Sequence, residues 1–132
     1  MSDWNGWELG RVVLATAAVM YAGIWAQVTL FHWAAAFASR AMWAPVIMTP
    51  FVVVAAVIAV VTRSDPWGWI AATALGIGVL DGLYGLYRHL RGTGSQVGGL
   101  TLRNLMAGPP PVLPLAYSLI GVVGLLGVLW DA

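Results

Sequence analysis

The chain has 132 residues, of which 61% are hydrophobic and only 8% are charged, and its formal net charge is +1. An ordinary soluble domain has about 25% charged residues, so this composition excludes a water-soluble domain and predicts an integral membrane protein. The small net charge argues against a nucleic-acid binder, which needs a cluster of cations, and the absence of cysteine excludes disulfides and thiolate chemistry.

Four apolar segments follow one another along the chain, and each is long enough to cross a bilayer as an α-helix. The first lies between Arg11 and His32 and contains no charge. At about 1.5 Å per residue it spans the roughly 30 Å hydrocarbon core. Its acidic and aromatic N-terminal flank is not typical of a cleavable signal peptide, so we expect this helix to remain in the membrane. We predict a single all-α membrane domain over residues 1–132, with four transmembrane helices at about 9–37, 44–62, 67–90 and 113–130.

The second segment consists almost entirely of valine, alanine and isoleucine after residue 51. In water this composition would favour a strand, but an open strand in lipid leaves its backbone groups unpaired, so we predict a helix. A glycine-rich stretch from 91 to 111 follows the third segment and ends in three prolines, and residues 101–106 within it can form one or two helical turns at the interface. We therefore expect an up-down bundle with a structured loop between the third and fourth helices.

Arginine counting predicts the orientation of the bundle. Two arginines lie on the side of the N-terminus, whereas four lie on the opposite side: Arg40, Arg88, Arg91 and Arg103. Positive charge accumulates in cytoplasmic loops, so both termini are expected outside the cytoplasm, in a bacterial inner (plasma) membrane. All tryptophans except Trp25 fall near the two predicted interfaces, as the aromatic belts of membrane proteins do.

Asp81 is the one acidic residue within an apolar segment. A carboxylate at that depth costs roughly 3 kcal/mol or more, so it is normally paired, protonated or functional. Helical spacing places Tyr84 and Arg88 on nearly the same stripe as Asp81, and we expect Tyr84, Arg88 or Tyr21 to be its partner within the bundle. Two interpretations stay open: an acid that carries a proton or orients a ligand, and a buried acid whose hydrogen bonds fix helix packing.

The only two histidines, His32 and His89, end the first and third predicted helices. These helices run in the same direction, so both imidazoles are expected at a similar depth near the inner face. Two histidines that face each other across a bundle can ligate haem b, with Arg88 or Arg103 pairing with its propionates. The alternative is that each histidine is an interfacial residue that hydrogen-bonds headgroups or backbone. A metal site on His32 and His89 alone would need more ligands than the sequence offers.

Glycines spaced four or three apart occur in the third and fourth helices, at Gly78 and Gly82 and at Gly121, Gly124 and Gly127. Such faces let helices approach closely, either within one bundle or between copies or subunits. The long loop presents a lipid-facing or partner-facing polar surface, for which the candidates are Arg91, Gln96 and Asn104. Arginines at this interface also bind anionic lipid without any further function.

Several short runs are spread over most of the chain beyond residue 30: His32, Met42-Trp43-Ala44-Pro45, His89-Leu90-Arg91-Gly92, Asn104 and Gly108-Pro109-Pro110. Together they resemble a pattern in small uncharacterised four-helix bacterial membrane proteins. The resemblance implies the four-helix topology, and it implies no activity or ligand.

Three functions are compatible with these features. Small size, short polar loops and glycine faces favour an accessory or structural subunit of an inner-membrane complex, which would contact lipid and either other membrane subunits or further copies of itself. His32 and His89 favour a haem b electron-transfer module. Asp81 would suit a proton or small-solute carrier, which needs an oligomer to form a pathway. The sequence shows no complete set of catalytic residues, which favours a protein that is not an enzyme.

Overall fold

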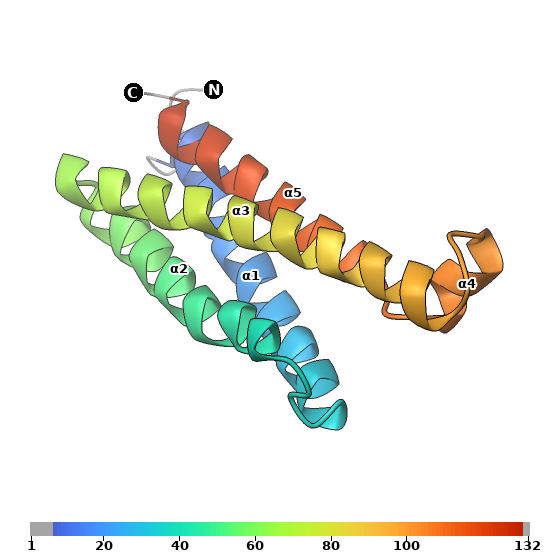
Figure 1. The fold of residues 1–132 in the computed structure, drawn as a ribbon. Coiled ribbons are helices and arrows are strands. Elements are labelled where there is room, and N and C mark those ends of the chain that lie inside the picture. The colour runs from blue at the N-terminus through green and yellow to red at the C-terminus, as the bar shows by residue number, and fades with distance from the viewer. Residues whose placement is uncertain (1–6, 131–132) are drawn as a thin grey trace.

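The computed structural model describes residues 7–130, and this part of the chain folds into helices without a strand. The elements, in chain order, are α1 (Leu9–Ala34), the short 3-10 helix η1 (Arg40–Met42), α2 (Trp43–Thr62), α3 (Asp65–Gln96), α4 (Leu102–Ala107) and α5 (Val112–Leu129) (Figure 1). Helices α1, α2 with η1, α3 and α5 are each long and apolar enough to cross a membrane. The prediction of an all-helical, multi-pass membrane protein is confirmed to this extent.

The four long helices pack around a small common core. Helix α1 packs against α2 and α5, and α3 packs against the same two helices. The core contains Leu14 and Tyr21 from α1, Val52 from α2, Leu75 from α3 and Tyr117 from α5. Many large apolar side chains remain on the outside of the bundle, such as Val19, Phe51 and Leu80. An exterior of this kind requires lipid in place of water.

Glycines allow the helices to approach closely around the Tyr21 side chain. A Cβ atom added at Gly78 of α3 would lie 2.8 Å from the Tyr21 hydroxyl oxygen, and one added at Gly121 of α5 would lie 2.6 Å from it. The Tyr21 and Tyr117 rings pack edge to face, with their centroids 4.8 Å apart. A Cβ atom at Gly127 would lie 2.9 Å from the Gly10 carbonyl oxygen of α1. These glycines therefore serve packing within one bundle.

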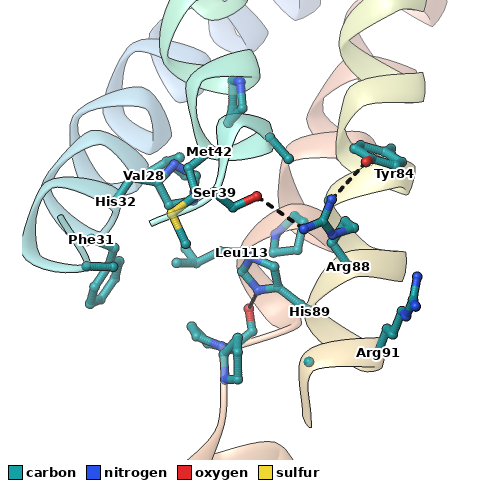
Figure 2. Close-up of a pocket in the computed structure, with 18 of the residues that line it drawn as sticks. Val28, Phe31, His32, Ser39, Met42, Tyr84, Arg88, His89, Arg91 and Leu113 are labelled. Carbon is teal, nitrogen blue, oxygen red and sulfur yellow. Dashed lines mark hydrogen bonds between the residues drawn. The ribbon is translucent and has the colours of Figure 1, made fainter. Parts of the chain in front are cut away.

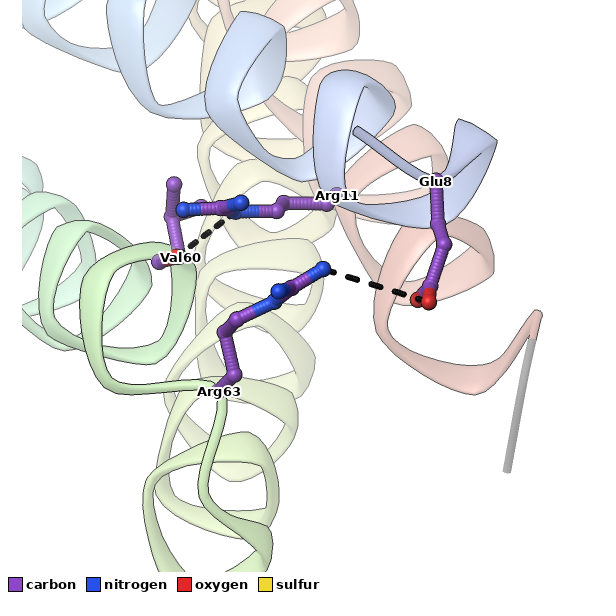
Figure 3. Close-up of polar contacts among 4 residues, drawn as sticks. All are labelled: Glu8, Arg11, Val60 and Arg63. Carbon is purple, nitrogen blue, oxygen red and sulfur yellow. Dashed lines mark hydrogen bonds and ion pairs between the residues drawn. The ribbon is translucent and has the colours of Figure 1, made fainter. Parts of the chain in front are cut away.

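Polar contacts join α1 and α2 at the end of the bundle where α1 begins and α5 ends. Arg11 Nε of α1 donates a hydrogen bond to the Val60 carbonyl of α2 over 2.9 Å, and the Arg11 guanidinium lies over the Trp7 ring at 4.0 Å. Arg63, which ends α2 with a left-handed φ of 53°, places Nη2 3.9 Å from Glu8 Oε1 (Figure 3). At the opposite end the α1–α2 pair and the α3–α5 pair diverge (Figure 1).

Helix α1 ends at Ala34 and is therefore three residues shorter than the predicted 9–37. The backbone of Ala36 and Phe37 adopts left-handed conformations with φ of 54° and 47°, which an α-helix cannot continue through. The Phe37 ring stacks on Trp43, with centroids 4.0 Å apart, and this contact accompanies the turn into η1 and α2.

Helix α3 is longer than the predicted 67–90, since it begins at Asp65 and continues to Gln96 through Gly92 and Gly94. Thr93 is completely buried in the added turn, and its hydroxyl donates to the His89 carbonyl. Gly108 packs directly on it, since a Cβ atom there would lie 2.9 Å from Thr93 Oγ1. The helix therefore gains tertiary contacts that offset the low helix propensity of its glycines.

Candidate functional site

A cavity of about 820 Å³ opens where the two helix pairs diverge (Figure 2). One wall comes from the end of α1, the connection to α2 and η1, and the other comes from the second half of α3 and the start of α5. This volume is within the range of small-molecule sites in proteins, which is about 300–1,000 Å³. Seven of the predicted site residues line it: His32, Asp81, Tyr84, Arg88, His89, Arg91 and Gln96.

Arg88 crosses the cavity from α3 to the opposite wall. Its Nη1 donates to the Tyr84 hydroxyl over 3.0 Å, and its Nη2 donates to Ser39 Oγ over 3.1 Å (Figure 2). Ser39 belongs to the segment between α1 and η1, so the bond joins the two diverging helix pairs. Both acceptors are uncharged hydroxyl groups, and they fix the position of the guanidinium without neutralising it.

Asp81 lies deeper in the same cavity, and two of its three expected partners, Tyr84 and Arg88, bond other groups. Tyr84 accepts from Arg88, and Arg88 also reaches Ser39. Asp81 Oδ2 and the Tyr21 hydroxyl are both buried and have no hydrogen-bond partner within residues 7–130. The expectation that Asp81 bonds Tyr84, Arg88 or Tyr21 is therefore wrong for this oxygen. The reason is geometric, because the Arg88 guanidinium bonds Tyr84 one turn back along α3 and Ser39 across the cavity, whereas Asp81 lies about two turns away.

The two histidines lie on opposite walls of the cavity. His89 Nδ1 is 2.8 Å from the Pro110 carbonyl oxygen, to which it donates when that nitrogen carries the proton. The carbonyl can only accept, so this bond places the imidazole lone pair on Nε2. His32 Nδ1 is buried and has no hydrogen-bond partner in the described part of the chain. Both histidines line one cavity, and their ligation of a cofactor stays a prediction.

The remaining predicted residues lie outside the cavity. Asn104 stabilises α4, because its side chain donates to the Gly99 carbonyl over 2.9 Å and its backbone N–H donates to Thr101 Oγ1 over 3.2 Å. Arg103 is exposed on α4. Tyr21 belongs to the bundle core. No group of three or more histidine, cysteine or acidic side chains is placed to hold a metal ion in residues 7–130.

Sequence reasoning did not identify Ser39 and Pro110 as contributors to this cavity. Each acts through a contact between positions far apart in the chain, Ser39 with Arg88 and Pro110 with His89. Ser39 could have been identified as a polar residue directly before the second predicted helix, at the depth predicted for Arg88. Pro110 contributes a backbone carbonyl, which any residue type possesses, so its identity carries no such signal.

No protein-family model matches this chain, and neither a curated protein nor a solved structure matches it.

Proposed function

We propose that this chain is an accessory subunit of a bacterial inner-membrane complex, and that it holds an amphipathic small molecule in the cavity at its inner face. Its four long helices would form an up-down bundle with both termini outside, as the arginine distribution favours. The cavity between the α1–α2 and α3–α5 pairs would then open toward the cytoplasmic interface. Lipid would surround the rest of the bundle.

The observation that carries this proposal is a pair of polar atoms on the cavity wall. Asp81 Oδ2 and His32 Nδ1 are buried, and neither has a hydrogen-bond partner within the described residues. Both residues line the same cavity. Buried polar groups are nearly always satisfied by protein, water or a ligand, so two such groups on facing walls of one cavity support a site that receives polar groups from outside the chain.

Extraction of small molecules from the purified protein tests the ligand. Ala38 lines the cavity, whereas Ala26 is exposed on the outside of α1 and does not line it, so Ala38→Trp and Ala26→Trp form a matched pair. We expect mass spectrometry of organic extracts to show a molecule enriched in the wild type and in Ala26→Trp, and depleted in Ala38→Trp. Identical extracts from all three proteins would contradict the proposal.

The accessory role is tested by mild solubilisation and native electrophoresis. We expect the chain to migrate as part of a defined larger assembly rather than near its own mass of 14.0 kDa plus detergent. Migration as a single chain under conditions that preserve other inner-membrane complexes would remove the accessory role, and it would leave the ligand site to be judged by the extraction experiment.

Haem b is the second candidate ligand, because both histidines border the cavity and His89 is oriented as metal-bound histidines are. Such histidines usually donate their second ring nitrogen to a carbonyl or carboxylate, as His89 Nδ1 can to Pro110. We expect the protein purified from haem-replete cells to absorb in the Soret region, and His32→Ala and His89→Ala each to abolish that band. A colourless wild type that also fails to take up added haem would eliminate this candidate.

A further inference from the structure

Arg88 is a cation in the cavity with no anionic partner among residues 7–130. Its hydrogen-bond acceptors are the hydroxyls of Tyr84 and Ser39, which carry no charge. Within residues 7–130 the structure has one ion pair with charged atoms closer than 4.0 Å, and it joins Arg63 to Glu8 at the opposite end of the bundle. A guanidinium has five donors, so two neutral acceptors leave donors for a further group.

Asp81, the acidic residue that lines the cavity, does not compensate this charge. It precedes Arg88 by about two helical turns, roughly 10 Å along α3, and its buried Oδ2 accepts no hydrogen bond from the described residues. Arg91 also lines the cavity, one turn farther toward the open end. The open end of the cavity is therefore positively charged, and the one carboxyl group that lines the cavity among the described residues, that of Asp81, lies farther from this end.

The wall opposite Arg88 is largely apolar. Its side chains include Val28 and Phe31 from α1 and Met42 from η1. Leu113 from α5 adds an apolar group on the side of Arg88, and Figure 2 shows these four residues around the same space. We infer that the cavity binds an anionic amphiphile, whose phosphate or carboxylate accepts hydrogen bonds from Arg88 and whose apolar part lies along this wall. This inference rests on the proposed ligand-holding function and specifies the chemical class of the ligand.

The two hydroxyls that hold Arg88 suit this role. Arginine matches phosphate and carboxylate with two parallel N–H donors, provided that the guanidinium plane is fixed. Tyr84 Oη and Ser39 Oγ fix it from two different segments, and the guanidinium carbon lies 5.8 Å from the Tyr84 ring centroid. Basic pockets between transmembrane helices on the cytoplasmic side are a known setting for anionic lipid headgroups.

Native mass spectrometry of the full chain tests this inference. The protein in detergent is offered equal amounts of phosphatidylglycerol and phosphatidylcholine with identical acyl chains. We expect the wild type to retain one phosphatidylglycerol with roughly tenfold or greater preference, as a charge-assisted hydrogen-bonded pair provides. Arg88→Gln should reduce this preference to near unity. Arg103→Gln, which removes the same charge from exposed α4, should preserve it.

Two further variants keep the test valid if Arg88→Gln folds poorly. Arg88→Lys retains the charge without the planar pair of donors and should show an intermediate preference. Tyr84→Phe retains the guanidinium but removes one positioning hydroxyl, and it should lower the preference several-fold. If both variants bound phosphatidylglycerol with the wild-type preference, the assignment of Arg88 as the headgroup ligand would be overturned.

The remaining outcomes separate this inference from the function on which it rests. Equal retention of both lipids by the wild type would overturn the anionic class, while a ligand depleted by Ala38→Trp would still support the ligand-holding function. Binding of inorganic phosphate alone, lost in Arg88→Gln, would show a soluble anion site and overturn the amphiphile. Identical extracts from wild type and Ala38→Trp, together with no lipid preference, would overturn both.

Discussion

Arg88 on α3 donates a hydrogen bond over 3.1 Å to Ser39 in the connection between α1 and α2, two residues 49 positions apart in the sequence. This bond joins the two helix pairs at the end where they diverge. At the other end Arg11 bonds the Val60 carbonyl, and Arg63 faces Glu8. The two contacts at that other end join α1 to α2, whereas the Arg88–Ser39 bond joins the α1–α2 pair to the α3–α5 pair and so restrains the width of the cavity.

Removal of the Ser39 hydroxyl should make the cavity open more often. The hydrogen bond contributes about 1 kcal/mol, so Ser39→Ala should raise the open population about fivefold. The chain has no cysteine, so Val28→Cys introduces a single buried thiol on the cavity wall. We expect a soluble maleimide to label that thiol about fivefold faster when Ser39→Ala is added. Ser95→Ala removes a hydroxyl that bonds within α3 and should leave the rate unchanged.

Because the helices approach closely around Tyr21, adding a single methyl group at a glycine there should lower the unfolding free energy markedly. In Gly121→Ala the new Cβ would lie 2.6 Å from the Tyr21 hydroxyl oxygen and 2.7 Å from Val79 Cγ2. Overpacking of this kind typically costs about 1–3 kcal/mol of unfolding free energy, which SDS titration in mixed micelles measures. The matched control is Gly76→Ala, because nothing lies within 4 Å of its new Cβ. An equally small effect of both substitutions would contradict this close packing around Tyr21.

A buried hydroxyl pair predicts a second, smaller effect on stability. The Thr49 hydroxyl donates to the Pro45 carbonyl, so it must accept from the Tyr117 hydroxyl, which lies 2.9 Å away. Tyr117→Phe should lower the unfolding free energy by about 0.5–1.5 kcal/mol. Tyr87→Phe removes a hydroxyl from an exposed ring and should have no measurable effect. If the two variants unfold alike, the Thr49–Tyr117 bond does not contribute to stability.

The proposed orientation is tested by reporter fusions. We expect a reporter fused after the C-terminus to be active outside the cytoplasm, and one inserted between Gly98 and Gly99 to be active inside it. These glycines follow α3 and have positive φ values of 89° and 124°, so an insertion there avoids the helix itself. A cytoplasmic signal from the C-terminal fusion would contradict the orientation.

The presence of the helices was predictable from the sequence, and two of their ends were not. Uninterrupted apolar runs predicted the four long helices, because only a helix satisfies the backbone in lipid without help from other segments. The ends of α1 and α3 depend on tertiary contacts. The Phe37 ring stacks on Trp43 after α1 has ended, and Gly108 packs on Thr93 to stabilise the last turns of α3. Local propensity cannot include either contact.

The members of the site were more predictable than their interactions. Depth along each helix placed His32, Arg88 and His89 near the same end of the bundle, and all three line the cavity. Which polar group bonds which depends on side-chain direction across a gap. Helical spacing and depth predicted Tyr84, Arg88 or Tyr21 as the partner of Asp81. In the structure Arg88 bonds Ser39, and Asp81 Oδ2 has no hydrogen bond among the residues described.

The divergence of the two helix pairs has a consequence for the surrounding bilayer. A bundle that is broader at one end than at the other (Figure 1) displaces more lipid area from one leaflet than from the opposite leaflet. Such a wedge-shaped inclusion fits a curved sheet of lipid better than a flat one. The energy of the protein in its membrane then depends on local curvature, and rotation of one helix pair against the other would change the shape that the lipids have to match.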